Sequence, residues 1–208
     1  TVSISPSSSV TVIDELTCSA TGTDLNDGSL TASYTWTNST TGATMGSTDT
    51  LQLDSANATP NDIITCMASF TDNNGASVSG SGSITVINTP PEINSSAEIT
   101  PDTGVYVGTT LTCSATATDA DDGTITPTYE WSVNGNAIGT GATYTVDAAD
   151  VDVADDIVCT ATATDNNGDT ATTTDSVLVD NTNPTITASI SANGSTNTGE
   201  LTCTATAS

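Results

Sequence analysis

The chain contains no Lys, no Arg and no His, while 25 Asp and Glu residues give it a formal net charge of −25 over 208 residues. Without cationic side chains no surface can neutralise phosphate, which excludes a protein that binds nucleic acid or anionic lipid surfaces. Without His or Lys there is no imidazole base, no imidazole metal ligand and no Schiff base. The carboxylates can therefore only repel one another, accept hydrogen bonds or bind cations from solution.

Long apolar runs are also missing. No stretch of about 18 apolar residues occurs, so we expect no membrane insertion in this segment. The first residues lack the charged and apolar regions of a secretion signal, and we expect any such signal to be removed or to lie outside this sequence. Only 3% of the residues are aromatic, but the regular spacing of Val, Ile and Leu argues against disorder, and the length indicates two domains.

The sequence repeats itself. Residues 16–20 recur in nearly the same form at 111–115 and at 201–205. The segments at 86–93 and 179–186 share the pattern V-x-N-T-x-P-x-I. Repetition at a fixed period indicates a tandem array of similar structural units.

We therefore predict a first domain at residues 1–88 with an incomplete first strand, a second domain at 89–181, and the first strands of a third domain, cut short, at 182–208. This arrangement indicates a segment of a longer array. The alternative is a half-domain that another molecule completes by strand addition.

Each unit reads as all-β. Apolar residues alternate with Thr and Ser at period two, for example at Leu16, Cys18 and Ala20. Alternation rich in β-branched residues predicts half-buried antiparallel strands. The pairs Asn74-Gly75, Asn134-Gly135 and Asn167-Gly168 predict tight hairpin turns between them.

A Cys…Trp…Cys order recurs in both complete units. The first Cys precedes the Trp by 18 residues, and the second follows it by 30 or 28. The residues are Cys18, Trp36, Cys66, Cys113, Trp131 and Cys159. This order on about seven short strands resembles the immunoglobulin-like (Ig-like) β-sandwich. The resemblance implies an all-β fold of tandem Ig-like β-sandwich domains arranged as a rod, with one inter-sheet disulfide and one buried Trp in each domain.

The resemblance pairs Cys18 with Cys66 and Cys113 with Cys159. The tyrosine that antibody domains carry two residues before the second Cys is replaced by Ile at both positions. The chain is more similar to the Thr-rich, acidic Ig-like or PKD-like repeats of bacterial and archaeal extracellular surface and filament proteins. Disulfides imply an oxidising compartment, and we expect an extracellular or cell-surface location.

The fifth cysteine, Cys203, has no partner within the sequence. We expect it to pair with a cysteine beyond Ser208. An intermolecular disulfide is the alternative.

Each of the first four cysteines is followed six residues later by an Asp that opens a turn. In an Ig-like sandwich these turns are the B–C and F–G loops, which lie together at the end facing the preceding domain. Carboxylate and amide oxygens without a basic partner suit Ca²⁺, which takes six to eight oxygen ligands. The candidate ligands at the junction of the first two units are Asp119, Asp121, Asp122, Asp165, Asn167 and Glu92. The alternative is that these residues only form turns and that the chain holds no cofactor.

Four sequons for N-glycosylation occur, at Asn38, Asn57, Asn94 and Asn193, which makes a glycoprotein a further hypothesis. The alternative is that Asn, Ser and Thr serve only solubility and strand propensity.

These features favour a structural segment of an extracellular filament, stalk or adhesin shaft. Its expected partners are further copies of the same repeat in a longer chain or fibre, with lateral contacts between copies as an added possibility. The alternative is an extracellular module that binds a carbohydrate or protein ligand through its loops. We do not expect an enzyme, because a two-carboxylate glycosidase is the only chemistry these residues allow, and the acidic residues lie in or beside turns.

Overall fold

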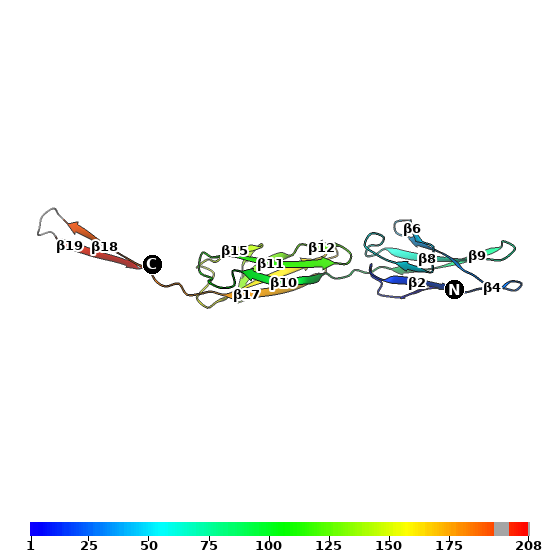
Figure 1. Ribbon diagram of the computed structural model, residues 1–208, viewed down its shortest axis with the longest axis horizontal. Helices are drawn as coiled ribbons and strands as arrows, with labels where there is room; N and C mark the ends of the chain where they lie inside the picture. The colour runs from blue at the N-terminus through cyan, green and yellow to red at the C-terminus, as the bar shows by residue number, and fades with distance from the viewer. Residues whose placement is uncertain (194–199, 208) are drawn as a thin grey trace.

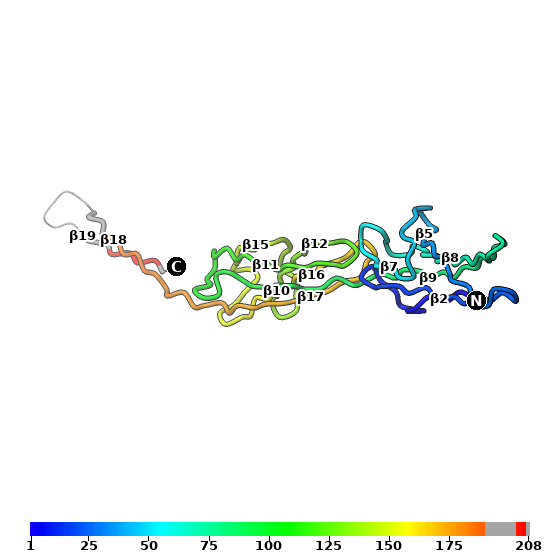
Figure 2. Tube along the Cα trace, turned by 45° about the vertical axis from the view of Figure 1, so that its right-hand side comes forward, coloured from blue at the N-terminus to red at the C-terminus, as the bar shows by residue number. Residues whose placement is uncertain are grey.

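The computed structural model describes residues 1–193 and 200–207, and the regular structure in these ranges is β throughout. Two sandwiches follow one another along the long axis of the molecule, and a separate hairpin lies beyond the second (Figure 1). The tube in Figure 2 gives the same order from another side. Among the described residues there is no helix with the length and apolar character that a membrane crossing requires.

The first sandwich consists of a three-stranded sheet and a four-stranded sheet. The three-stranded sheet has the order β1 (Val2–Ser5), β2 (Glu15–Ala20) and β7 (Thr50–Gln52). The four-stranded sheet has the order β6 (Ala43–Gly46), β5 (Ser33–Asn38), β8 (Ile63–Thr71) and β9 (Ser77–Thr85). A short hairpin of β3 (Gly22–Asp24) and β4 (Gly28–Leu30) follows β2. Neighbouring strands in both sheets are antiparallel.

The second sandwich repeats this arrangement. One sheet contains β10 (Glu92–Thr100), β11 (Thr110–Asp119), β12 (Gly123–Ile125) and β15 (Thr143–Thr145). The other has the order β14 (Asn136–Thr140), β13 (Thr128–Val133), β16 (Asp156–Thr164) and β17 (Thr170–Leu178). The last two strands, β18 (Ile186–Asn193) and β19 (Glu200–Ala207), pair only with each other among the described residues.

The period-two pattern of the sequence is the reason for the layers. Along β8 the residues alternate between facing inward and outward, and Ile64, Cys66, Ala68 and Phe70 are the buried ones. Successive side chains of a strand point to opposite faces, so alternation with Thr and Ser gives each sheet one apolar face. Two such faces pack together and form one core per sandwich. The domain boundaries at 88 and 181 remain predictions. The two cores lie on either side of the boundary at 88.

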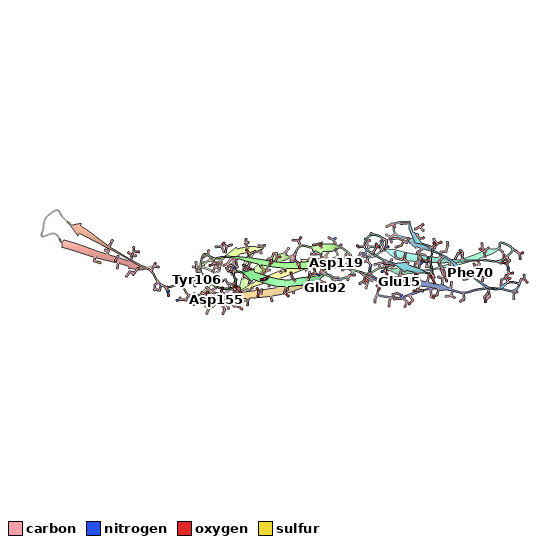
Figure 3. All side chains as sticks on the ribbon, viewed as in Figure 1. Glu15, Phe70, Glu92, Tyr106, Asp119 and Asp155 are labelled. Carbon is pink, nitrogen blue, oxygen red and sulfur yellow. A yellow bond between two sulfur atoms is a disulfide. The ribbon has the colours of Figure 1, made fainter. Side chains whose placement is uncertain are left out.

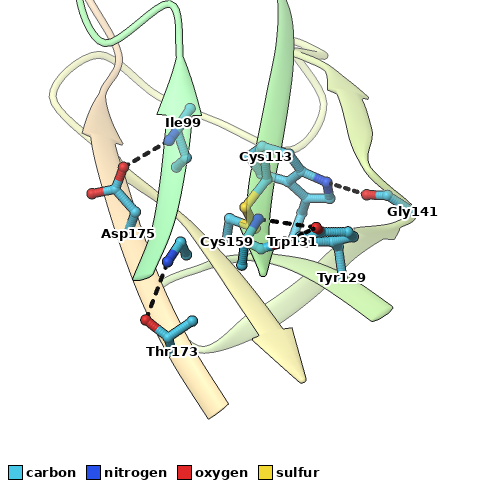
Figure 4. The surroundings of a disulfide bond; sticks show 10 residues. Ile99, Cys113, Tyr129, Trp131, Gly141, Cys159, Thr173 and Asp175 are labelled. Atoms are coloured by element: carbon cyan, nitrogen blue, oxygen red, sulfur yellow. Dashed lines mark hydrogen bonds between the residues drawn. A yellow bond between two sulfur atoms is a disulfide. The ribbon is translucent and has the colours of Figure 1, made fainter. Parts of the chain in front are cut away.

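A disulfide and a tryptophan occupy the centre of each core. Cys18 bonds to Cys66 between β2 and β8, and Cys113 bonds to Cys159 between β11 and β16. Both disulfides connect the two sheets and confirm the predicted pairing, and Figure 4 shows the one between Cys113 and Cys159. They span 48 and 46 residues, and closing a loop of this length contributes about 4 kcal/mol in the chain-entropy model.

Both indoles are fully buried, as the resemblance implied. Trp36 donates its Nε1–H to the carbonyl oxygen of Thr48, and Trp131 donates to that of Gly141, both at 2.9 Å. Each indole therefore has its single polar group satisfied inside the core.

The strand order departs from that of antibody constant domains in one respect. The strand that follows the Trp strand stays in its sheet, since β6 pairs with β5 and β14 pairs with β13. In the constant-type domain the fourth strand lies in the opposite sheet. In each sandwich, a sheet of three or four strands that contains the first Cys therefore faces a four-stranded sheet that contains the Trp and the second Cys.

The first strand of each sandwich contacts both sheets. In the second sandwich β10 pairs with β11, and its backbone N–H groups at Ala97 and Ile99 also donate to Thr173 Oγ1 and Asp175 Oδ2 on β17, at 3.2 and 2.8 Å (Figure 4). Strand β10 therefore closes one side of the sandwich.

The first sandwich closes the same side with glycines. Gly82 lies opposite Cys66 on β9, in the way that Asp175 lies opposite Cys159 on β17. A Cβ at Gly82 would lie 3.4 Å from the Val2 carbonyl oxygen and one at Gly80 would lie 3.3 Å from Val2 Cγ2, so β1 packs closely over the glycines of β9.

Candidate functional site

The joint between the two sandwiches contains the largest concentration of polar contacts between distant parts of the chain. It consists of the linker at residues 86–93 and two turns of the second sandwich, at 119–123 and 165–169. Figure 3 places Asp119 and Glu92 at the end of the second sandwich that faces the first. These are the B–C and F–G loops, at the end that the resemblance predicted.

The B–C loop is built by an aspartate that caps its own turn. Asp119 Oδ1 accepts hydrogen bonds from the backbone N–H groups of Asp121 and Asp122, at 2.7 and 3.0 Å. Aspartate forms such a turn because its carboxylate reaches the backbone two residues on. The same turn occurs in the first sandwich, where Asp24 Oδ1 accepts from Asn26 and Asp27 at 2.7 and 3.0 Å.

Asp122 ties the two loops together. Its two carboxylate oxygens accept hydrogen bonds from the backbone N–H and the side-chain Nδ2 of Asn166, at 2.8 and 2.7 Å. Asp27 and Asn73 make the same pair of contacts in the first sandwich, at 3.1 and 2.7 Å. Asp122 is therefore part of a loop clamp that does not depend on the joint.

Asp165 organises the F–G loop and also contacts the linker. Its Oδ1 accepts from the backbone N–H groups of Asn167, Gly168 and Asp169, and its Oδ2 accepts from Asn88 Nδ2 at 2.8 Å. The hydrogen bond from Asn88 is the main reason that the pKa of Asp165 lies below its ordinary value. Both oxygens of this carboxylate are engaged.

The linker is fixed to both loops. Asn88 Nδ2 also donates to Asp169 Oδ2 at 2.9 Å, and the backbone N–H of Thr89 donates to Asp121 Oδ2 at 2.7 Å. Ala120, at the tip of the B–C loop, packs against the core of the first sandwich. Its counterpart in the first sandwich, Leu25, is fully exposed.

Four buried oxygen atoms in the described part of the chain accept or donate no hydrogen bond, and all four belong to this joint. They are Asn88 Oδ1, Thr89 Oγ1, Asp119 Oδ2 and Asp121 Oδ1. Asp119 is only 7% exposed. Burial raises the pKa of Asp121, the hydrogen bond from Thr89 opposes this, and the charge of Asp119 adds to the rise.

The six candidate calcium ligands have different surroundings. Asp122 and Asp165 have both carboxylate oxygens engaged in loop hydrogen bonds, whereas Glu92 and Asn167 are exposed at the surface. Among the six, only Asp119 and Asp121 have a buried oxygen without a hydrogen-bond partner. Within residues 1–193 and 200–207 no group of three or more His, Cys, Asp and Glu is arranged to hold a metal ion. Calcium binding by this set of six remains a prediction.

Sequence reasoning missed Asn88 and Thr89. Their signal was present, because the same Asn-Thr pair recurs at 181–182 in the repeated joint pattern. The recurrence marks the joint as part of the repeat, but it does not by itself indicate a site.

The loop of the first sandwich nearest the joint has its own buried carboxylate. Asp62 is 5% exposed, and its Oδ2 accepts from Asn38 Nδ2 at 2.8 Å and from the Thr59 backbone N–H at 3.0 Å. Burial raises the pKa of Asp62, but these hydrogen bonds outweigh it, and the pKa lies below the ordinary 3.8. This carboxylate is occupied by its own loop.

The sequons differ in access. Asn38 is 2% exposed, and its amide nitrogen donates to Asp62 Oδ2 at 2.8 Å, so it is the least accessible of the sequon residues whose side chains are described. Asn57 is half-buried and donates to the Gln52 carbonyl, whereas Asn94 is exposed. The motif at Asn193 extends outside the described residues. Glycosylation at these positions remains a prediction.

Cys203 is exposed and makes no disulfide with the described residues. Its partner, within or beyond this molecule, stays a prediction.

Comparisons with known proteins find no matching family model and no matching curated protein. Several solved structures match. The three N-terminal domains of the bacteriophage RB49 Highly Immunogenic Outer Capsid protein (Hoc) are 15% identical, with 96% of this chain and 66% of that chain covered and a TM-score of 0.32. A tetra-tandem repeat in the extending region of a large adhesion protein is 18% identical, with 99% and 62% covered and a TM-score of 0.33.

A third match is a Ca²⁺-stabilized adhesin that helps an Antarctic bacterium reach out and bind ice. It is 19% identical, with 91% of this chain and 51% of that chain covered and a TM-score of 0.31. The chain thus spans about half to two thirds of the length of these structures. The fold itself is that of tandem Ig-like β-sandwiches, each with one inter-sheet disulfide, as the strand order and the bonded cysteines of this chain define it.

Proposed function

We propose that this chain is a segment of the shaft of an extracellular filament, stalk or adhesin, in which disulfide-linked Ig-like sandwiches are joined end to end. The joint is the observation that carries the proposal. Asn88 and Thr89 of the linker hydrogen-bond to both loops of the second sandwich, and Ala120 of the second sandwich packs against the core of the first.

Such a joint resists bending better than a flexible linker does. A Gly/Ser-rich linker behaves as a random coil, whereas this one has two consecutive prolines, Pro90 and Pro91, directly after the hydrogen-bonded residues. Each sandwich is in turn held closed by its disulfide. A stiff element repeated along one axis is what a shaft requires.

The repeated joint pattern supports an array longer than two units. Asn181 and Thr182 stand at the same place in V-x-N-T-x-P-x-I as Asn88 and Thr89. We infer that they clamp the third unit in the same way, so that the partners of this segment are further copies of the repeat.

The chemistry of the chain supports an extracellular location. Two disulfides that hold the cores together require an oxidising compartment to form and persist. The formal charge of −25 also keeps neighbouring shafts apart, because like charges repel over about 8–10 Å at physiological salt.

A module that binds ligands through its loops is a weaker proposal. The B–C and F–G loops of the second sandwich are engaged in the joint, so they are not free for a ligand. Both tryptophans are buried in cores, and the chain contains no Arg, whereas binding hot spots are enriched in Trp, Tyr and Arg.

Electron microscopy of cells that produce the protein, labelled with a gold-conjugated antibody against this segment, tests the proposal. We expect gold particles at regular intervals along thin surface fibres. Label confined to the tips of such fibres, or found only on dispersed soluble protein, contradicts a role in the shaft.

A further inference from the structure

We propose that the joint between the two sandwiches binds one divalent cation, Ca²⁺, through Asp119 Oδ2, Asp121 Oδ1, Thr89 Oγ1 and Asn88 Oδ1. The inference goes beyond the role in a shaft, which needs only a stiff joint. The proposed set of ligands also differs from the six residues expected from the sequence, because two of its four ligand oxygens belong to the linker residues Asn88 and Thr89.

The observed hydrogen bonds bring the two segments together. Thr89 N–H donates to Asp121 Oδ2 at 2.7 Å, which holds the linker against the B–C loop. The Asp121 backbone N–H donates to Asp119 Oδ1 at 2.7 Å, which holds both residues in one turn, and the charge of Asp119 acts on the Asp121 carboxylate. In both carboxylates one oxygen is thereby fixed, and the other is the unpartnered one.

Asn88 is oriented by the contacts of its nitrogen. Its Nδ2 donates to two carboxylates, Asp165 and Asp169, so the amide oxygen must point away from them. That oxygen is buried and accepts no hydrogen bond from any residue that the structure describes. The side chain thus presents an acceptor at the joint.

The four oxygens have no hydrogen-bond donor among the residues that the structure describes. Three of them can only accept, and the Thr89 hydroxyl can donate a single hydrogen bond. An unsatisfied buried acceptor is costly, and more so when it is charged. The chain has no Lys, Arg or His, so no side chain can come in to neutralise Asp119 and Asp121.

The donor chemistry selects Ca²⁺ among common cations. Carboxylate, amide and hydroxyl oxygens are hard ligands, and His and thiolate ligands for zinc or copper are missing at the joint. Two carboxylates balance a divalent charge. Ca²⁺ accepts an irregular set of ligands completed by water, whereas Mg²⁺ demands near-ideal octahedral geometry and dehydrates reluctantly.

Binding would couple directly to the stiffness of the joint. Ala120, which packs against the first core, lies between Asp119 and Asp121 in the sequence. A cation that draws these two carboxylates to the linker therefore holds the residue that connects the sandwiches.

Isothermal titration calorimetry on the full chain tests the site, after removal of metal with EDTA and dialysis into 150 mM NaCl to suppress diffuse binding to acidic surface. We expect one saturable Ca²⁺ site per chain and weaker binding of Mg²⁺. Asp119→Asn keeps one side-chain oxygen to cap the turn but replaces the unpartnered oxygen, Oδ2, with an amide nitrogen. This variant should weaken Ca²⁺ binding about tenfold or more, because Ca²⁺ affinity depends on the number of charged ligands.

The chain offers a matched control. Asp24→Asn makes the same change in the same kind of turn, at the end of the first sandwich that lies away from the joint. It should leave Ca²⁺ binding unchanged.

A second variant separates a ligand role from a structural one. Thr89→Val removes the hydroxyl and keeps the backbone N–H that binds Asp121. Without Ca²⁺ it should change the melting temperature little, because the hydroxyl of the half-buried Thr89 makes at most a weak contact with Asp121. In saturating Ca²⁺ it should lower the melting temperature relative to wild type, because a ligand is lost.

The inference is overturned if wild type shows no saturable Ca²⁺ site, or if Asp119→Asn and Asp24→Asn bind Ca²⁺ equally well. It is also overturned if Thr89→Val has the same effect on melting with and without Ca²⁺. None of these results affects the proposed role in a shaft, which is tested by the position of the antibody label.

Discussion

Equivalent residues of the two sandwiches make the same local contacts in different surroundings. Asp24 and Asp119 cap identical turns, but only Asp119 is buried against a neighbouring domain. Leu25 and Ala120 follow them, one fully exposed and the other packed against a core. The repeated sequence therefore predicts the turn. Whether that turn is also part of a site depends on the position of its domain in the array.

Sequence reasoning was most successful for residues whose chemistry leaves few alternatives. The four paired cysteines and the two buried tryptophans were all identified in advance, because they stand at inward positions of alternating strands. Asn88 could not be identified in this way. An Asn beside prolines reads as a turn residue, and its contacts with Asp165 and Asp169 join positions about 80 residues apart.

Asp62 gives a residue-scale prediction about pH. Its pKa is lowered in the folded protein, so the folded state binds fewer protons than the unfolded state below the ordinary value of 3.8. The stabilisation it provides is present above that pH and is lost as the pH falls through the folded pKa. Asp62→Asn removes the charge, and it should cost about 1 kcal/mol at pH 7, because hydrogen bonds to a charged acceptor are the stronger ones.

Urea unfolding at a series of pH values checks this. The difference in unfolding free energy between wild type and Asp62→Asn should shrink as the pH falls below 3.8. Glu15→Gln, at an exposed position of the same sandwich, serves as the control and should show no such change. A difference that stays constant down to pH 2 would argue against the assigned hydrogen bonds.

At the scale of strands, the alternation of apolar and polar residues predicted strands such as β2, where Leu16 and Cys18 are buried, and the Asn-Gly turns predicted the hairpins. The turn formed by Asn134 and Gly135 connects β13 to β14, and both residues have positive φ. The sequence could not reveal how β10 and β1 contact the opposite sheet. That contact uses side chains of β17 in one sandwich and glycines of β9 in the other, so no common pattern exists to be recognised.

The closing contact of β10 leads to an element-scale prediction. Asp175→Ala removes the acceptor of the Ile99 N–H, at 2.8 Å, and should destabilise the second sandwich by about 1–2 kcal/mol because a partly buried donor is left without a partner. Asp175→Asn keeps an acceptor oxygen and should lose less. Chemical unfolding of both variants measures the difference, and equal losses would mean that β10 does not depend on this hydrogen bond.

At the scale of the whole molecule, the end-to-end order of units followed from the repeat, but the joint did not. In the joint, the linker contacts two loops that are distant from it in sequence. The spacing of the repeat does not determine the angle between the sandwiches. The account therefore depends most on Ala120, because this small residue is the direct apolar contact from the second sandwich to the first core.

Ala120→Asp should loosen the joint, because it places a carboxylate against the first core. Leu25→Asp makes the corresponding change at the end of the first sandwich away from the joint, where the side chain is fully exposed, and should have no effect on the shape of the molecule. Both variants should keep their disulfides and unfold at nearly the wild-type urea concentration, which separates loosening of the joint from loss of the fold.

Small-angle X-ray scattering of the full chain in solution measures the central claim most directly. A compact domain of this length would have a radius of gyration of about 17 Å. The account predicts a clearly larger value for wild type and for Leu25→Asp, with identical scattering curves, and a changed curve with a wider range of interdomain distances for Ala120→Asp. A radius near that of a compact domain, or the same curve for all three proteins, would contradict a stiff joint between stacked sandwiches.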